Sequence, residues 1–193
     1  MAEADPIGVF LEWFAHARAT ETHDATAMAL ATTDADGNPS ARMVLLKDAD
    51  RRGFVFYTNL ESPKSDHLRH RARAALCFHW AKLQRQVRVE GSVEPVAPVE
   101  ADAYFATRPR LSQLGAWASQ QSKPMESRLA LEGALAGVAL RFAIGPVPRP
   151  PHWSGWRVLP ERMEFWQQHQ FRLHDRQRFI RSGAGWAVER LFP

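Results

Sequence analysis

Apolar and polar residues alternate along several short segments of the chain, a pattern typical of β-strands that have one buried face. In one of these segments Val87 and Val89 alternate with polar residues, so one face is apolar and the other polar. Turns rich in Asp separate the first strands at 34–37 and 48–53. The predicted strands are 27–33, 40–47, 54–58, 74–80, 84–94, 153–158, 162–167, 172–180 and 186–191.

Helical periodicity is less common along the chain. Asp5 and Pro6 are typical of a helix N-cap and first helical position, and apolar residues recur at helical spacing after them. Ser62 and Pro63 predict a second, short helix with the same capping chemistry. Two further helices are predicted at 100–107 and 126–143.

The stretch 145–151 contains four prolines and cannot continue the preceding helix. It is either a linker between domains or a connection within one domain. Because the four strands that follow it are too few for an independent domain, we predict a single domain over 1–193. Mostly antiparallel strands with a few peripheral helices predict the α+β class, with the strands closed into a β-barrel.

Composition narrows the classes of function. The 193 residues are 45% hydrophobic and include seven Trp and eleven Phe, enough for a substantial core. The net charge of +4 permits nucleic-acid binding, but the arginines are scattered and no nucleic-acid motif accompanies them. We therefore expect no nucleic-acid partner. The spacing of His and of the single Cys predicts no metal site. The chain has no long apolar run and no signal peptide, so we expect no membrane association and a cytoplasmic protein.

Two groups of cationic residues point to an anionic ligand. Arg172, His174 and Arg176 would share one face of the strand 172–180, where they repel one another unless an anion lies against them. A phosphorylated ligand is the simplest candidate, and a solvated strand face is the alternative. Arg42 lies within an apolar strand, where a charged side chain needs a partner.

Seven motifs occur in order along the chain: Ser40 to Lys47, Tyr57 to Lys64, Arg85 to Val87, Tyr104 to Trp117, Gln120 to Ser122, Arg172 to Arg176, and Arg190 to Pro193. Together they resemble the pyridoxine/pyridoxamine 5′-phosphate oxidases, from about Asp5 to Pro193. This resemblance implies an FMN-binding split β-barrel. It also implies that FMN oxidises pyridoxine 5′-phosphate and pyridoxamine 5′-phosphate to pyridoxal 5′-phosphate, that O₂ reoxidises the flavin to give H₂O₂, and that the amine substrate releases ammonia.

The resemblance also implies which residues bind the ligands. Arg172 and His174 are expected to lie over the reacting C4′ carbon as catalytic residues, and whether either is an acid or a base stays open. The residues expected to bind FMN are Arg42, Met43, Val44, Leu45, Leu46, Lys47, Tyr57, Thr58, Lys64, Gln86, Gln121, Ser122, Trp166 and Arg176. Those expected to bind the substrate are Lys47, Tyr104, Arg108, Ser112, Arg172 and His174.

Geometry leaves two of these assignments open. Tyr104 and Arg108 are four apart on a predicted helix and face the same way, but Pro109 tends to end that helix. Ser112 therefore reaches the site either one helical turn further on or from a loop. Arg42 and Lys47 are five residues apart on one predicted strand, so their side chains would face opposite sides of a flat sheet. Either a twist, a bulge or the end of the strand brings both to one ligand, or they serve different sites.

The chain departs from the family pattern in two places. Pro63 stands where the family commonly has a second cation, which predicts one fewer ionic contact to the flavin phosphate. Only a few residues precede the first helix, so the longer N-terminal arm of many members is not expected, and substrate shielding is in question.

The oligomeric state and the reaction each have alternatives. The resemblance implies a homodimer with FMN between the subunits, although the aromatic residues could also fill a monomeric barrel. An oxidase acting on another small ring, as in phenazine-forming relatives, is an alternative to the oxidase of phosphorylated B6 vitamers. A non-enzymatic flavin or pyridoxal-phosphate carrier is another.

Overall fold

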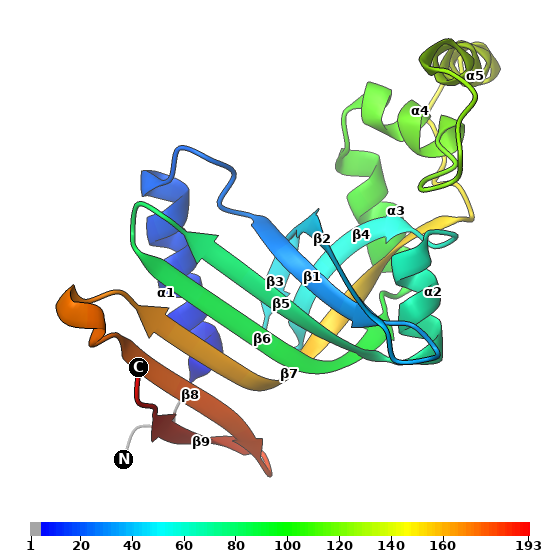
Figure 1. The fold of residues 1–193 in the computed structure, drawn as a ribbon. Coiled ribbons are helices and arrows are strands. Elements are labelled where there is room, and N and C mark those ends of the chain that lie inside the picture. Colours follow the sequence, from blue (N-terminus) through cyan, green and yellow to red (C-terminus); the bar gives the residue numbers. More distant parts are fainter. Residues whose placement is uncertain (1–4) are drawn as a thin grey trace.

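The computed structural model describes residues 5–193, in which nine antiparallel strands form one curled sheet flanked by five α-helices (Figure 1). The strand order is β2-β1-β5-β6-β7-β4-β3, with β8 paired to β7 and β9 paired to β8. The strands are β1 (Ala27–Thr33), β2 (Pro39–Leu45), β3 (Asp48–Asp50), β4 (Gly53–Asn59), β5 (Arg73–Trp80), β6 (Arg85–Pro95), β7 (Trp153–Gln167), β8 (Asp175–Ser182) and β9 (Gly185–Arg190).

The helices lie at the periphery of the sheet, as the sequence predicts (Figure 1). No helix within residues 5–193 is both long and apolar enough to cross a membrane. The helices are α1 (Pro6–Thr20), α2 (Pro63–His70), α3 (Pro98–Thr107), α4 (Arg110–Ala118) and α5 (Arg128–Arg141), with a short 3₁₀ turn, η1 (Gln170–Arg172).

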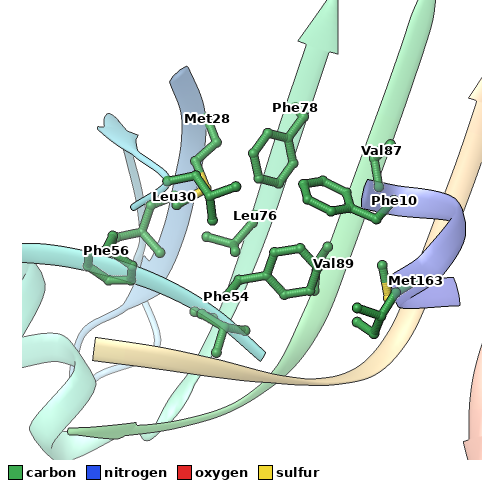
Figure 2. Packing of buried hydrophobic residues seen from close by; sticks show 14 of the residues in the cluster. Phe10, Met28, Leu30, Phe54, Phe56, Leu76, Phe78, Val87, Val89 and Met163 are labelled. Atoms are coloured by element: carbon green, nitrogen blue, oxygen red, sulfur yellow. The ribbon is translucent and has the colours of Figure 1, made fainter. Parts of the chain in front are cut away.

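The main core fills the concave side of the sheet (Figure 2). Phe10 of α1 packs edge-on against Phe54, with ring centroids 4.8 Å apart, and lies 5.0 Å from the ring of Phe78. Alternate residues of β5 and β6 point into the same cluster because successive side chains of a strand face opposite sides. Helix α1 therefore closes one end of the curled sheet. A smaller cluster that includes Phe105 and Trp153 lies under α3 and α4.

Two of the predicted strands are one strand. The sequence predicts a break near Pro160, yet β7 runs unbroken through it. The pairing with β6 shifts register between Glu90 and Gly91, and this β-bulge accommodates the proline. A Cβ atom on Gly91 would lie 1.8 Å from the carbonyl oxygen of Leu159, so only glycine fits there. The turn predicted at 48–53 also contains a strand, β3, which pairs with β4.

The prediction that Arg172, His174 and Arg176 share one strand face is wrong. Strand β8 begins only at Asp175. Before it, Phe171 and Arg172 have φ of 57° and 60°, a left-handed conformation that turns the chain. Because the backbone is not extended there, the two-residue spacing of these cations does not place them on a common face.

The predicted helix starts were partly right. The Asp5 carboxylate accepts a hydrogen bond from the Gly8 amide at 3.0 Å, which confirms the first N-cap. Ser62 precedes α2 as predicted, but its side chain makes no capping bond. Its hydroxyl instead donates to the Asn59 carbonyl at 2.7 Å and accepts from Lys64 Nζ at 2.9 Å. Helix α4 was not predicted.

Candidate active site

A cavity of about 720 Å³ opens where β2 and β4 end, between the sheet and helices α3 and α4. Three cationic side chains line it, those of Lys47, Lys64 and Arg108. Among the described residues that line the cavity there is no Asp or Glu. Cations that gather around a cavity without carboxylates repel one another, so the cavity is suited to an anionic ligand.

Arg108 lies at the C-terminal end of α3, with its guanidinium packed between aromatic rings. Its Cζ atom is 4.7 Å from the ring centroid of Trp153 and 5.5 Å from that of Phe105. Among residues 5–193, Arg108 Nη1 is the one buried side-chain nitrogen or oxygen that lacks a hydrogen-bond partner. Burial lowers the pKa of Arg108. A phosphate oxygen would supply both the missing acceptor and the missing charge.

Tyr104 and Ser112 reach the same cavity from two different helices. The Tyr104 ring stacks on Tyr57 with centroids 4.2 Å apart. Helix α3 ends before Pro109 and α4 begins at Arg110, so Ser112 lies in the first turn of a new helix. Neither the continued helix nor the loop considered from the sequence is correct.

Lys64 lies at the start of α2, where its ammonium is largely buried. It donates to Thr58 Oγ1 at 3.0 Å, Ser62 Oγ at 2.9 Å and Gln121 Oε1 at 2.7 Å. All three acceptors are neutral. Burial and the nearby charge of Arg42 lower the pKa of Lys64 to about 8. An anion beside Lys64 would stabilise its charged form.

Of Arg42 and Lys47, only Lys47 lines the cavity. Arg42 points inward and donates to the Leu30 carbonyl at 3.1 Å, to Thr32 Oγ1 at 2.7 Å and to Ser40 Oγ at 2.7 Å. All these partners are neutral, so the anion expected for Arg42 is not a carboxylate of its own chain. Strand β2 ends at Leu45, and Lys47 beyond it lines the cavity. Lys47 thus reaches the cavity from beyond the end of the strand, whereas Arg42 stays within the strand, with its charge near Lys64.

Some of the residues expected to bind FMN lie beside the cavity and do not line it. The Leu46 side chain is buried in the main core, and its backbone N–H donates to the Thr26 carbonyl at 2.9 Å. Ser122 adopts a φ of 69° in the loop after α4, directly after Gln121. The expected residues that do line the cavity are Met43, Val44, Leu45, Lys47, Tyr57, Thr58, Lys64, Tyr104, Arg108, Ser112 and Gln121.

Three other expected FMN ligands form a row across three neighbouring strands. Gln86 of β6 is paired with Trp166 of β7, and Trp166 is paired with Arg176 of β8. Directly paired residues point to the same face of a sheet, so the three side chains lie side by side. His174 joins this cross-strand row, because its ring centroid is 4.7 Å from that of Trp166. The row was not evident from the sequence.

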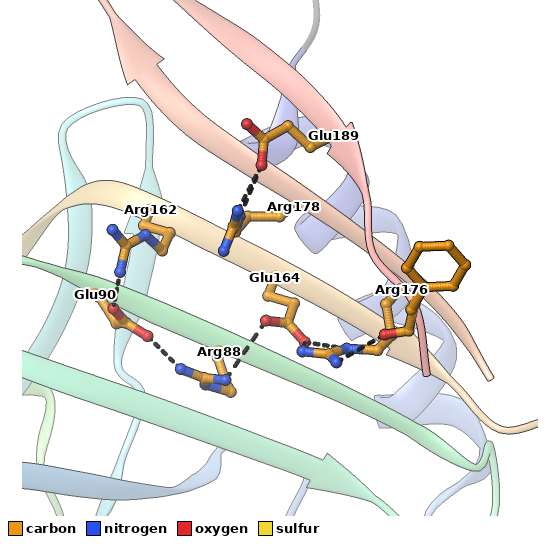
Figure 3. A network of polar contacts seen from close by, with 8 residues as sticks. Arg88, Glu90, Arg162, Glu164, Arg176, Arg178 and Glu189 are labelled. Carbon is orange, nitrogen blue, oxygen red and sulfur yellow. Dashed lines mark hydrogen bonds and ion pairs between the residues drawn. The ribbon is translucent and has the colours of Figure 1, made fainter. Parts of the chain in front are cut away.

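A carboxylate of the same chain neutralises Arg176 (Figure 3). Arg176 Nη2 lies 2.8 Å from Glu164 Oε1, and its Nη1 donates to the Phe192 carbonyl at 3.0 Å. Glu164 also pairs with Arg88 at 3.5 Å. The anion that lies against Arg176 in this copy is therefore a carboxylate of the same chain, whereas the sequence analysis took a phosphorylated ligand as the simplest candidate.

The cavity and the cross-strand row lie at opposite ends of the sheet (Figure 1). Strand β7 links them, because Trp153 at its start lines the cavity and Trp166 near its end belongs to the row. The two tryptophans are thirteen positions apart on the strand, which corresponds to roughly 40 Å of extended chain. One small ligand cannot touch both groups within a single copy.

Trp153 is a cavity residue that the sequence did not single out. Its ring is parallel to that of Tyr57, with centroids 5.2 Å apart, and the Arg108 guanidinium packs over it. A tryptophan that opens a strand after a proline-rich stretch is ordinarily a core residue, so its position alone carried no signal.

Two family models match the chain. One, described as pyridoxamine 5′-phosphate oxidase, matches residues 14–142. The chain belongs to this oxidase family. The second model, described as the pyridoxine 5′-phosphate oxidase C-terminal dimerisation region, matches residues 153–193. The resemblance inferred from the ordered motifs is confirmed.

Individual members of the oxidase family are similar over nearly their whole length. The chain is 59% identical over 191 residues to pyridoxine/pyridoxamine 5′-phosphate oxidase of Maricaulis maris (strain MCS10), covering 98% of this chain and 86% of that protein. It is 58% identical over 194 residues to the enzyme of the same name from Azorhizobium caulinodans, covering 100% of this chain and 92% of that protein.

Solved structures of relatives share the fold. PhzG from Burkholderia lata 383, crystallised with tetrahydrophenazine-1-carboxylic acid, has a TM-score of 0.93 and 31% identity, covering 100% of this chain and 94% of that chain. A pyridoxamine 5′-phosphate oxidase-related, FMN-binding protein from Nostoc punctiforme has a TM-score of 0.78 at 16% identity, covering 98% of this chain and 99% of that chain. The split β-barrel predicted for the oxidase family is thereby confirmed.

Proposed function

We propose that this protein oxidises pyridoxine 5′-phosphate and pyridoxamine 5′-phosphate to pyridoxal 5′-phosphate, with FMN as cofactor and O₂ as electron acceptor. The products are H₂O₂ and, from the amine, ammonia, and the reaction belongs to vitamin B6 biosynthesis and salvage. The observation that carries the proposal is the cavity, which Lys47, Lys64 and Arg108 line without a carboxylate among the described lining residues. The chain is also 59% identical to a pyridoxine/pyridoxamine 5′-phosphate oxidase.

The residues around the cavity fit FMN. Arg42 and Lys64 carry charge without a carboxylate partner, which suits the flavin phosphate. Thr58 and Gln121 offer hydroxyl and amide groups to the polar edges of the ring. Bound FMN supplies the electron-accepting ring that takes a hydride equivalent from C4′ of the substrate and is reoxidised by O₂. Pro63 opens α2, so Lys64 is the cation available at the start of that helix.

The substrate phosphate is assigned to the other side of the cavity. Arg108 provides the buried guanidinium, while Tyr104 and Ser112 add hydroxyl groups from α3 and α4. Lys47, at the end of β2, adds a second cation. These residues orient the vitamer by its phosphate, and they leave the pyridine ring free to lie against the flavin.

A homodimer completes the site in this proposal. The second copy supplies its Gln86, Trp166 and Arg176 to the flavin and its Arg172 and His174 to the substrate. The proposal is supported by the position of these residues at the opposite end of the sheet from the cavity, and by the match of 153–193 to a dimerisation region (Figure 1). Two-fold symmetry then produces two equivalent sites per dimer.

The test of the proposed activity is anaerobic mixing of the yellow protein with pyridoxamine 5′-phosphate. Bleaching of the flavin absorbance, followed by recovery when O₂ is admitted, is expected. Unphosphorylated pyridoxamine is the matched control and should bleach the flavin far more slowly, because it lacks the group that Arg108 binds. A flavin that stays oxidised with pyridoxamine 5′-phosphate would instead identify a carrier.

An oxidase of phenazine precursors is the second candidate, and the similarity to PhzG favours it. Such a substrate carries a carboxylate and no phosphate, and its fused rings are larger than a pyridine. Bleaching by a dihydrophenazine carboxylate but not by pyridoxamine 5′-phosphate would select this candidate. Arg108 Nη1 can pair with either anion, and the 59% identity to a pyridoxine/pyridoxamine 5′-phosphate oxidase, against 31% to PhzG, supports the phosphorylated substrate.

Two further statements belong to the proposal. The chain 1–193 is one domain, supported by the single sheet that joins strands from before and after 145–151. The protein acts in the cytoplasm in this proposal. The charge of the proposed substrates supports this location, because phosphate esters do not cross membranes unaided.

Arg42→Ala is expected to weaken FMN binding by a factor of roughly 10 to 100, because a charge-assisted hydrogen bond contributes about 1.5–3 kcal/mol. Substrate affinity at saturating flavin should change little. Fluorescence titration of the flavin-free protein with FMN measures the effect, and Arg18→Ala on α1 is a surface control. Unchanged flavin affinity would remove Arg42 from the site.

FMN affinity is expected to fall as the pH rises above about 8, the pKa of Lys64 before ligand binds. Below this pH the ammonium is charged and pairs with phosphate. Above it, binding must be accompanied by uptake of one proton, so affinity falls by up to about tenfold per pH unit. In Lys64→Arg the side chain stays charged, and the decline should disappear between pH 8 and 10. An equally steep decline in both proteins would assign the titration to another group.

A further inference from the structure

We propose that Gln113 is a positioning residue for the substrate phosphate clamp, and that it acts by fixing the elbow between α3 and α4. The inference rests on the proposed function and adds a residue that does not touch the ligand. Gln113 is absent from the described residues that line the cavity, while Ser112 beside it and Arg108 before it both line it.

The contacts of Gln113 tie the two helices together. Its side chain, on α4, is 8% exposed. Nε2 donates to the Phe105 carbonyl at 3.0 Å and to the Ala106 carbonyl at 3.3 Å. These carbonyls belong to the last turn of α3, where C=O groups lack the regular helical partner, and the Phe105 carbonyl also accepts from the Arg108 N–H at 3.2 Å. A buried amide thus caps the helix that carries Tyr104 and Arg108.

The elbow also has a backbone hydrogen bond from the Arg108 N–H to the Phe105 carbonyl, and Phe105 and Leu114 belong to one buried cluster. The Gln113 amide adds side-chain hydrogen bonds from α4 to α3. Only Arg108 and Pro109 separate the two helices, and the proline has no N–H with which to continue α3. The Arg108 guanidinium is held by packing against the rings of Phe105 and Trp153, and its Nη1 has no acceptor in the described chain. Its position therefore depends on the backbone of the elbow, which the Gln113 amide holds in place.

A small movement of this elbow would affect substrate binding more than chemistry. Arg108 contacts the phosphate, far from the carbon that is oxidised, so its misplacement weakens ground state and transition state alike. The flavin contacts from β2, β4 and α2 do not depend on the elbow, and Gln121 in the loop after α4 is held by its hydrogen bonds to Thr58 and Lys64. The expected signature is a raised KM with an unchanged kcat and an unchanged FMN affinity.

The test is Gln113→Met, which keeps the volume and removes the hydrogen-bonding amide. KM for pyridoxamine 5′-phosphate is expected to rise about tenfold, with kcat and the Kd of FMN within about twofold. Val89→Ala on β6 is the control, because it truncates a fully buried core side chain far from the elbow. The two variants are compared after their thermal unfolding midpoints have been measured. The inference would be overturned if Gln113→Met left KM unchanged. It would also be overturned if Gln113→Met lowered kcat and FMN affinity to the same extent as Val89→Ala.

Gln113→Glu provides a second measurement that general destabilisation would not reproduce. A carboxylate there would face two carbonyl oxygens, whereas the protonated acid can donate one hydrogen bond. Its KM should therefore fall towards the wild-type value as the pH is lowered, and the ratio of variant to wild-type KM removes pH effects common to both. A pH-independent ratio would contradict the proposed role.

Combining Gln113→Met with Arg108→Ala separates this inference from the proposed function. If the glutamine acts through Arg108, the double variant should have nearly the KM of Arg108→Ala alone. Fully multiplicative effects would contradict the inference while wild-type turnover of pyridoxamine 5′-phosphate still supported the function. Absence of wild-type turnover would refute the proposed function, and binding of pyridoxal 5′-phosphate to Gln113→Met would then test the clamp by itself.

Discussion

Co-expression of an Arg108→Ala subunit with an Arg172→Ala subunit is expected to restore oxidase activity that each variant lacks alone. In the proposed dimer, each site takes Arg108 from one copy and Arg172 from the other. A mixed dimer therefore has one site with both arginines intact and one site with neither. Random pairing makes half of the dimers mixed, and one of the two sites in each mixed dimer is intact. Activity should therefore reach about a quarter of the wild-type level. The assay uses a substrate concentration below the wild-type KM, where Arg108→Ala is least active.

The matched control places both substitutions in one subunit and pairs it with the wild type. Each site of that mixed dimer lacks one arginine, so only wild-type homodimers are active, again about a quarter of the total. If the site lay within one chain, this mixture would keep about half of the activity. The pair of single variants would then recover none. The two mixtures together decide between a shared site and a site within one copy.

Arg172→Ala is expected to slow reduction of the bound flavin by about 100-fold at saturating pyridoxamine 5′-phosphate, with FMN still bound. Arg172 lies in the turn before β8 at a φ of 60°, next to Phe171 at 57°. Left-handed backbone at two successive non-glycine residues is strained, and such strain is common where a side chain is held for function. Arg172 is placed over the reacting carbon in the proposed dimer, so its loss should appear in the chemical step.

Stopped-flow reduction under anaerobic conditions, with flavin occupancy matched, measures this effect. Arg108→Ala provides the contrast, because loss of uniform phosphate binding should raise KM by roughly 10- to 100-fold and leave the saturated rate nearly unchanged. Arg172→Lys tests whether charge alone is sufficient. Reduction of Arg172→Ala at the wild-type rate would make the turn a structural or phosphate-binding element and refute its catalytic assignment.

The chain sequence by itself determined the class of fold and most of its elements. Alternation of apolar residues placed the strands of the first half, because a strand with one buried face needs that period whatever it packs against. The Asp5-Pro6 start of α1 was equally clear, since capping is a local interaction. The ordered motifs identified the oxidase family, and so indicated which side chains would bind ligands.

Tertiary structure decided how those side chains are grouped. Register between strands placed Gln86, Trp166 and Arg176 in one row, and pairing over such long sequence separations leaves no local signal. The bulge at Gly91 kept β7 continuous past Pro160 and thereby set Trp153 and Trp166 at opposite ends of one strand. The left-handed turn at Arg172 and the start of α4 after Pro109 depend on backbone geometry that no periodicity encodes. Sequence could therefore name the residues expected to bind ligands, but only the fold divided them into two groups at opposite ends of the sheet.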